Sequence, residues 1–407
     1  MDTVKYTCEH QGCGGCLYLG TPYEEQLNIK ETLVRNLLDS AGIVPGEFLG
    51  VKGSPVITAY RNKMDYTFGD EYKGGPITLG MHKYKSFMSI ITTDRCLLVD
   101  DDFNRILSSV LSFAKSKGYT AYNKKSHQGF LRNLVLRRGV KTEEILINLV
   151  TTSETDLGAT GFVEMINGLE LRLCLKGVLH TVYDGLADFV YCDELRVLYG
   201  EDYYMEKVLG LDFKINAFSF FQTNVPATES LYKTAISWID IYKKRVLDLY
   251  CGAGVITLIL LDEQRKLTMG GGALTEDRLN NGSGSVTGVE LSAEAVRDAK
   301  ENASINNLNN CNFIQGDVLE VIDSMREDPP DVIVVDPPRV GIHPKALKKI
   351  MALGAKEIVY ISCNPRSLAD NLKTLSEVYE VLRVQPFDNF PFTKHVETIA
   401  LLKHRFG

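Results

Sequence analysis

The sequence predicts an α/β protein in which a β-rich region precedes a parallel sheet covered by helices. From about residue 211 onward, short buried-type strands alternate with helical patterns, which is typical of a parallel sheet with both faces covered. Before that, short β-rich runs are separated by Gly, Asn and Asp turns, which predicts an antiparallel or mixed sheet. Because 407 residues are too many for one ordinary core, two or three domains are expected. The changes of pattern along the chain divide it into three parts, 1–53, 54–210 and 211–407.

The composition is that of a globular protein, with 44% hydrophobic and 24% charged residues. It has no apolar run of about 18 residues, so no membrane span is expected. The first ten residues, MDTVKYTCEH, lack the features of a signal peptide, and we expect a cytoplasmic monomer. Nine cysteines, an odd number, favour metal binding or catalysis over a disulfide framework.

The charge is unevenly distributed. The whole chain has a net charge of −7, but residues 58–140 hold fourteen Lys and Arg against seven Asp and Glu. That segment is therefore +7 and the remainder −14. A local basic region on an acidic protein is typical of a nucleic-acid binder, although a solvated surface would show the same pattern.

The N-terminal part begins with a group of thiols, 8-CEHQGCGGC-16, followed by a predicted amphipathic helix over 22–42. In the central part, 131-LRNLVLRRG-139 and 143-EEILINLVTT-152 are expected to form strands. The helix begins at Pro22 and ends at Gly42, and four leucines fall near one face: Leu27, Leu33, Leu37 and Leu38.

The C-terminal part opens with a strand, a Gly turn and a helix, 246-VLDLYCGAGVITLIL-260. Gly252 and Gly254 would let the backbone approach a ligand closely, next to the free N–H groups of a helix N-terminus. A dinucleotide fingerprint would have a third Gly where Thr257 stands. The turn alone is therefore weak evidence for a particular cofactor.

The next strand ends in 288-GVELS-292, where Glu290 could accept hydrogen bonds from both ribose hydroxyls. Such an acid normally follows the glycines by about 20 residues, whereas Gly252 and Glu290 are 38 apart. The low-complexity stretch 268-TMGGGALTEDRLNNGSGS-285 accounts for the extra 18. We interpret it as a flexible surface insertion in the crossover.

Two further strand ends complete a cofactor pattern. Asp317, in 316-GD-317, could meet an adenine amine, and Asp336 opens 336-DPPR-339. A glycine turn, a ribose acid, GD and DPP in this order indicate S-adenosylmethionine (SAM) bound to a methyltransferase sheet. Another kind of Rossmann-like nucleotide-binding domain is the alternative.

A candidate nucleophile follows in 357-EIVYISCNPRSLADNL-372, where Cys363 lies between a buried strand and a helix N-terminus. Ligands of open α/β sheets bind at this edge, and the helix dipole with nearby Arg366 would favour the thiolate. Methylation at C5 of a pyrimidine needs such a group, because addition of a thiolate at C6 makes C5 nucleophilic. A base must then remove the C5 proton. Glu397 in 395-HVETIALL-402 is the candidate, although spacing alone cannot select it.

At this point the chain resembles a known family, the RNA 5-methyluridine methyltransferases, and within it the ribosomal RNA branch with an iron–sulfur cluster. The motifs FFQTN, DLYCGAG, DPPR, SCNP and HVET occur in family order, and the resemblance covers essentially the whole chain. We expect it to differ from many members in having no accessory N-terminal RNA-binding barrel, and it carries the low-complexity insertion.

The resemblance implies roles for individual residues. Cys363 matches the nucleophile and Glu397 the proton-abstracting base, with Arg339 and Asn364 as positioning groups. Four residues match SAM contacts: Gln222, Tyr250, Glu290 and Asp336. Gly252 and Asp317 are also expected to bind SAM, because of the strand-end pattern described above.

The thiol group has the spacing C-x4-C-x2-C, formed by Cys8, Cys13 and Cys16. This spacing suits iron–sulfur ligation with a distant fourth cysteine, and it equally suits a structural zinc site. The resemblance selects Cys96 as the fourth ligand and implies a 4Fe–4S cluster. We expect the cluster to be structural or part of the RNA surface, since methyl transfer needs no electrons.

We expect RNA as the partner, with 23S ribosomal RNA favoured and transfer RNA as the alternative. The target uridine must leave any stack to reach the thiol. An exocyclic amino methyltransferase and a non-catalytic iron–sulfur RNA-binding protein are alternatives of other classes. The basic region would supply charge and stacking faces through Tyr60, Arg61, Lys63, Tyr84, Arg132, Arg137 and Arg138.

Overall fold

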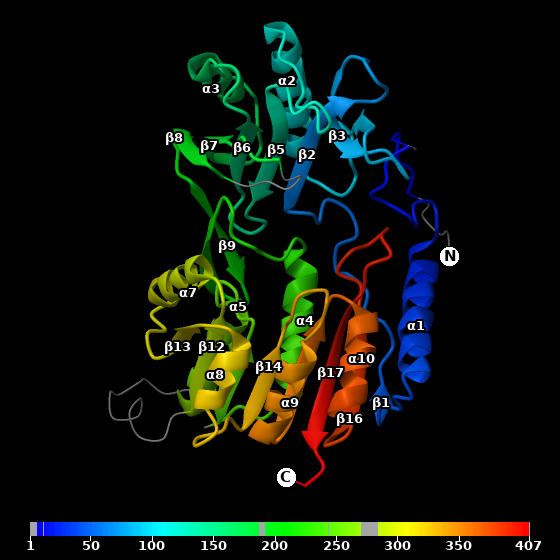
Figure 1. Cartoon of the computed structure of the whole chain (residues 1–407), viewed down its shortest axis with the longest axis vertical. Helices are drawn as coiled ribbons and strands as arrows, with labels where there is room; N and C mark the ends of the chain where they lie inside the picture. Colours follow the sequence, from blue (N-terminus) through cyan, green and yellow to red (C-terminus); the bar gives the residue numbers. More distant parts are fainter. Residues whose placement is uncertain (1–5, 11, 187–191, 243, 270–283, 407) are drawn as a thin grey trace.

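A computed structural model of the chain describes residues 6–10, 12–186, 192–242, 244–269 and 284–406. It contains two large sheets arranged along the long axis, the β-rich sheet at one end and the parallel sheet at the other (Figure 1). The α/β prediction, with a β-rich sheet ahead of a Rossmann-like sheet, is confirmed. Most of the predicted insertion, 268–285, lies outside the described residues.

The C-terminal sheet is parallel except for one strand, which runs antiparallel to both of its neighbours. This strand, β17, lies between β15 and β16. In spatial order the strands are β1 (Glu47–Phe48), β16 (Tyr379–Phe387), β17 (Glu397–His404), β15 (Glu357–Ser362), β14 (Val332–Val335), β11 (Arg245–Leu249), β12 (Ser285–Glu290) and β13 (Asn312–Gln315).

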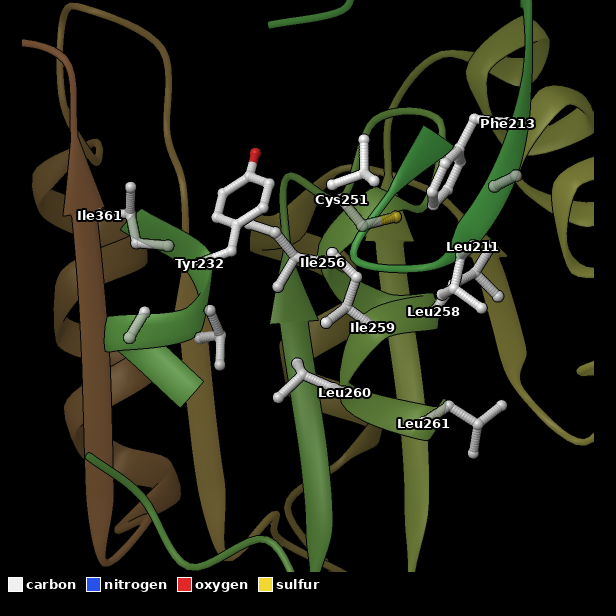
Figure 2. Packing of buried hydrophobic residues seen from close by; sticks show 14 of the residues in the cluster. Leu211, Phe213, Tyr232, Cys251, Ile256, Leu258, Ile259, Leu260, Leu261 and Ile361 are labelled. Carbon is white, nitrogen blue, oxygen red and sulfur yellow. The ribbon is translucent and has the colours of Figure 1, made fainter. Parts of the chain in front are cut away.

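Both faces of this sheet are buried, because successive strand residues belong to different cores. Val246 packs in one core, while Leu247 packs in the other. Figure 2 shows part of the first core, in which Cys251 lies among aliphatic and aromatic side chains. The first core is covered by α4 (Val225–Ser237), α5 (Val255–Met269) and α7 (Ala293–Ile305), and the second by α1 (Tyr23–Ser40), α8 (Val318–Ser324), α9 (Pro344–Leu353) and α10 (Pro365–Leu375).

The β-rich sheet is mixed, since β6 and β7 pair in parallel and the other neighbours pair antiparallel. Helices α2 (Asp101–Lys117) and α3 (Ala159–Asn167) contribute to its core. A hairpin of β9 (Tyr203–Val208) and β10 (Leu211–Asn216) follows. The sheet order is β4 (Ile90–Thr92), β3 (Ile77–His82), β2 (Lys63–Asp70), β5 (Leu131–Arg138), β6 (Glu144–Thr151), β7 (Cys174–Val182) and β8 (Glu194–Gly200).

The N-terminal helix α1 packs against α10 and β16, beside the C-terminal sheet (Figure 1). Its buried stripe is Gln26, Lys30, Val34 and Leu38. This differs from the predicted leucine face, because Leu33 is 39% exposed. Lys30 in this stripe pairs with the buried acid Asp388, and the pattern of apolar residues does not reveal that pair. None of the described helices has the length and apolar character needed to cross a bilayer.

Candidate active site and cysteine group

The site lies where the carboxyl ends of β11 and β14 meet. After β11 the chain continues to β12 and β13 on one side, and then returns to β14 on the other. Such a switch point leaves a crevice for ligands. Here it opens into a cavity of about 1330 Å³, which exceeds the usual volume of a small-molecule site, roughly 300–1,000 Å³. The cavity therefore has room for a cofactor and a nucleotide together.

All eight predicted catalytic and cofactor-binding residues line this one cavity. They come from segments that are far apart in the chain: Gln222, Tyr250, Gly252, Glu290, Asp317, Asp336, Cys363 and Glu397. The sequence motifs are therefore brought together in space.

The turn after β11 has a left-handed backbone at three positions. Tyr250, Gly252 and Gly254 have φ values of 65°, 53° and 80°. A side chain at Gly254 would place its Cβ 2.9 Å from the Phe313 ring, so the packing of the turn requires glycine there. For Tyr250 the conformation is unfavourable, and such strain is typical of ligand sites.

Glu290 is held by the turn that it faces. Its Oε2 accepts a hydrogen bond from the Gly252 amide at 3.1 Å, and its Oε1 accepts one from Ser292 at 2.9 Å. Asp317 caps α8, because its Oδ1 accepts from the Leu319 amide at 2.8 Å. Both carboxylates are thereby oriented, and each keeps lone pairs for a further donor.

Cys363 and Glu397 are neighbours through strand pairing. The register of β15 and β17 pairs Ser362 with Thr398. Cys363 is the next residue beyond β15, and Glu397 begins β17, so both lie at the same end of this pair. This pairing between distant segments places Glu397 beside Cys363, and the spacing of residues along the sequence could not show it.

Burial dominates the electrostatics at this end of the cavity. It raises the pKa of Cys363 to about 11, with further contributions from Glu397 and Asp336. Burial, with Asp336 as the next cause, raises the pKa of Glu397 to about 8. The pKa of Asp336 rises to about 7 for the same reason, burial.

The cation beside the thiol is not the predicted one. Arg339 lowers the pKa of both Cys363 and Glu397, opposing burial. The expected partner, Arg366, is exposed in the first turn of α10. Asn364 links the two segments, since its Oδ1 caps α10 and its Nδ2 donates to the Arg339 carbonyl at 2.8 Å.

Two of the cavity residues that were given no role from the sequence lie next to the proposed base. Phe390 and His395 lie on the loop before Glu397 and line the same cavity. Burial lowers the pKa of His395 to about 4, so its imidazole is neutral near pH 7. His395 opens the HVET motif, which was the available signal, whereas no local pattern marks Phe390, because its position depends on the path of a loop.

The four predicted cluster cysteines lie close enough to influence one another. Burial raises the pKa of Cys16 to about 12, and Cys96, Cys13 and Cys8 each raise it further. The Cys96 amide donates to Asn104 Oδ1 at 2.9 Å, which anchors this thiol to α2. Among the described residues, however, no three His, Cys, Asp or Glu side chains are arranged to hold a metal ion.

The expected RNA surface is largely wrong in its details. Tyr60, Arg132, Arg137 and Arg138 are buried, with at most 7% exposure. Arg137 donates to the Ser219 carbonyl at 2.7 Å, and Arg138 pairs with Asp100, so these guanidinium groups hold the fold together. Arg61 and Lys63 are half-buried. Tyr84, at 52% exposure, remains available at the surface.

Comparison with known proteins agrees with this geometry. Residues 196–405 match the family described as tRNA (uracil-5-)-methyltransferase. An uncharacterized RNA methyltransferase of Clostridium acetobutylicum is 45% identical over 395 residues, covering 97% of this chain and 82% of the relative. One from Caldanaerobacter subterraneus is 43% identical over 403 residues, covering 98% and 85%.

The chain belongs to the RNA uracil-C5 methyltransferase family. It is a SAM-dependent enzyme that methylates uracil C5 in RNA. The crystal structure of the tRNA (uracil-54, C5)-methyltransferase of Pyrococcus abyssi, in complex with S-adenosyl-L-homocysteine, matches it with a TM-score of 0.75 and 25% identity. That match covers 96% of this chain and 86% of the other. Family membership excludes both the amino methyltransferase and the non-catalytic alternatives.

Proposed function

We propose that this methyltransferase modifies uridine in 23S ribosomal RNA through a covalent bond between Cys363 Sγ and uracil C6. The observation that carries the chemistry is the shared cavity, in which the thiol, a buried carboxyl and the cofactor residues meet. The preference for ribosomal RNA is based on the cysteine group, which by the family resemblance is typical of that branch, although some cluster-bearing relatives act on transfer RNA. The proposed division into 1–53, 54–210 and 211–407 gives the cluster, RNA and catalytic parts.

The reaction begins when the Cys363 thiolate adds to C6 and electron density moves to C5. Bound SAM supplies the methyl group that C5 then accepts. Glu397 takes the C5 proton, the C5–C6 double bond re-forms, and the thiolate leaves. Atoms and charge balance, because the S–CH3 bond of the sulfonium breaks to leave neutral S-adenosylhomocysteine, the thiolate is regenerated, and the proton neutralises the carboxylate. Splitting the reaction in this way gives carbon nucleophilicity that the uracil ring otherwise lacks.

The raised pKa values constrain this mechanism. In the ligand-free protein near pH 7, both Cys363 and Glu397 hold protons, because their pKa values are about 11 and 8. Arg339 is the described cation that favours both anions. We infer that Arg339 helps the thiolate form once substrate is bound, and that Glu397 must lose its proton before it can act.

SAM would be held along the edge from β11 to β14. Glu290, already oriented by Gly252, would accept the ribose hydroxyls, and Asp317 would accept the adenine amine. Gln222, Tyr250 and Asp336 would contact the methionine portion and the reacting end. Their positions around one cavity support this assignment.

The four cysteines would hold a 4Fe–4S cluster. They form a group whose thiols raise one another's pKa. The C-x4-C-x2-C spacing suits both an iron–sulfur cluster and zinc, and the family resemblance is what favours the cluster. The cluster would act as a structural cross-link between the N-terminal loop and Cys96.

This cross-link would order an exposed hairpin tip, residues 83–89, between β3 and β4. The tip is hydrogen-bonded to the cysteine loop, since the Tyr84 amide donates to the Gly12 carbonyl at 2.8 Å. Phe87 is 88% exposed, and Lys85 Nζ lies 5.2 Å from the Tyr84 ring centroid. Aromatic rings beside cations suit unpaired nucleotides, so we propose this tip as an RNA contact.

Transfer RNA is the second candidate substrate. The match to a structure of a tRNA-modifying enzyme favours it. To separate the two, 5-methyluridine would be mapped in the ribosomal and transfer RNAs of the host with and without the gene. Loss from 23S ribosomal RNA alone supports the first proposal, whereas loss from transfer RNA alone contradicts it.

The cluster proposal has its own test. Protein purified without oxygen should be brown and contain about four irons per chain, and Cys96→Ala should lose the iron. Cys174→Ala changes an exposed cysteine outside the group and serves as the control. Stoichiometric zinc without iron in protein kept free of oxygen would contradict the assignment.

A further inference from the structure

The loop between β16 and β17, residues 388–396, is here called the base loop because it leads directly into Glu397. It also carries Phe390 and His395, which line the cavity. The strand register places Glu397 beside Cys363, and the base loop adds to this by holding the chain that enters β17. The segments that hold it come from the N-terminal third of the chain and from the turn before α4.

The first part of the base loop is fixed by a fully buried ion pair. Lys30 Nζ on α1 lies 2.5 Å from Asp388 Oδ1, and both side chains are inaccessible to solvent. Lys30 also donates to the Phe390 carbonyl at 3.1 Å. On the other side, Asn224 Nδ2 donates to the Asn389 carbonyl at 2.9 Å.

The middle of the base loop is fixed at a single residue, Phe392. Its amide donates to Gln26 Oε1 at 2.8 Å, and its carbonyl accepts from the Tyr18 amide at 2.9 Å. Its φ of 67° is unfavourable for an aromatic residue, so the surrounding packing must hold the backbone there.

The Phe392 ring is buried among residues of the cysteine segments. It is 1% exposed and forms a small separate core with Tyr60 and Leu98. Cys16 and Cys96 pack against this core, and the Tyr6 ring meets Phe392 edge-on at 5.3 Å. Two of the four proposed cluster ligands thus support the residue at the centre of the base loop.

We propose that Phe392 is a positioning residue, which transmits the packing of the cysteine segments to the base loop and so fixes the place of Glu397. This inference depends on the proposed function for the role of Glu397 and for the cluster. It gives the cysteine group a task in catalysis that needs no electron transfer. Loss of the cluster would loosen Phe392 and misplace the base, while Cys363 and the SAM residues stay in place.

A misplaced base has a distinctive signature. Addition of Cys363 and methylation come before removal of the C5 proton, so a loop defect should slow only the release of product. The methylated protein–RNA adduct should then accumulate. General destabilisation would instead lower adduct formation and release together, and would not give this pattern.

The test compares Phe392→Leu with Phe162→Leu. Phe162 is equally buried, but it lies in α3, in the core of the β-rich sheet. In single-turnover reactions with labelled SAM and RNA, Phe392→Leu should form adduct within about threefold of the wild-type rate. It should release the adduct about 10- to 100-fold more slowly, as expected for a misplaced catalytic group. Phe162→Leu should release it normally.

Two further measurements identify which step of the inference holds. Deuterium exchange at 388–396 should rise in Phe392→Leu and in Cys96→Ala, and the iron content of Phe392→Leu should equal that of the wild type. If Phe392→Leu does not fold, Tyr6→Leu is the second variant. It removes one ring contact to Phe392 while leaving the sequence of the base loop unchanged, and it should slow release to a smaller extent.

Normal release by Phe392→Leu in an iron-containing protein would overturn the inference and leave the proposed function standing. Slow release by Phe392→Leu, together with a wild-type protein that never contains iron, would support the positioning role and refute the cluster. Unchanged exchange at 388–396 in Cys96→Ala, with its iron lost, would overturn the coupling to the cysteine group.

Discussion

The two ends of the cavity hold carboxyl groups in contrasting ways. At the end formed by the glycine turn, Glu290 and Asp317 accept backbone hydrogen bonds that fix their orientation. At the other end, burial raises the pKa of Asp336 to about 7 and that of Glu397 to about 8. The difference suggests that the first end is ready to bind, whereas the second holds protons that must move during the reaction.

A third buried acid gives this comparison a reference point. Asp388 is buried, as Glu397 is, but it has the Lys30 ammonium as a partner. The pKa of Lys30 is lowered, chiefly by burial, while the nearby Asp388 carboxylate opposes that change. The buried Asp388 thus has a cationic partner where it holds the fold, whereas the buried Glu397, where we propose chemistry, has a second carboxyl, Asp336, acting on it as well as Arg339.

The largest effect on stability is expected from breaking that pair. Lys30→Met leaves Asp388 buried without its cation and should lower the free energy of unfolding by about 3–5 kcal/mol. Urea unfolding at pH 7 measures it. The double variant Lys30→Met, Asp388→Asn should recover most of the loss, because no uncompensated charge remains. A single variant as stable as the wild type would mean that the pair does not hold α1 to the base loop.

The next effect tests the end formed by the glycine turn. Glu290→Gln removes a charged acceptor for ribose hydroxyls and should weaken SAM binding by about 10- to 100-fold, as expected for one or two charge-assisted hydrogen bonds. Calorimetric titration with SAM measures the affinity. Glu320→Gln, an exposed acid on α8 outside the cavity, is the matched control and should bind normally. An affinity within twofold of wild type would remove Glu290 from the site.

The smallest effect is a change in stability with pH, which tests the protonation of Glu397 at the other end of the cavity. Unfolded Glu397 releases its proton near its ordinary pKa of 4.5, whereas the folded protein keeps it until about pH 8. Because the folded state binds more protons between these values, its free energy of unfolding falls as pH rises through this window, and the penalty is complete above pH 8.

Glu397→Gln cannot ionise and should escape this penalty. The variant should be more stable than wild type by about 1–2 kcal/mol at pH 9, less than the full shift implies because water reaches a buried anion. The gain should shrink toward pH 5. Urea unfolding across this range measures it, with exposed Glu377→Gln as the control. A gain that is independent of pH would show that Glu397 is not protonated in the fold.

The sequence predicts those parts of the molecule that depend on local pattern. The strand–turn–helix around Gly252 and the cysteine at the end of β15 follow from periodicity, glycine and proline, and the structure has them at these residues. The choice of Glu397 needed the family resemblance, because its place beside Cys363 is set by antiparallel pairing of β15 with β17.

Other features depend on tertiary contacts that no local pattern encodes. Arg137 and Arg138 were expected on the RNA surface, but buried carbonyls and Asp100 hold their guanidinium groups instead. The stripe of α1 was misread for a similar reason, since its buried Lys30 has its partner 358 residues away. The left-handed backbone of Phe392 gives no signal in the sequence at all.

The central claim is that Cys363 begins the reaction and Glu397 ends it. The most direct measurement is intact-mass analysis of denatured enzyme after incubation with RNA and methyl-labelled SAM. Glu397→Gln should accumulate a protein–RNA adduct that carries the label, because removal of a general base slows its step by about 100- to 10,000-fold. Cys363→Ala and the double variant should show none. Normal turnover by Glu397→Gln, or an adduct that forms without Cys363, would contradict the account.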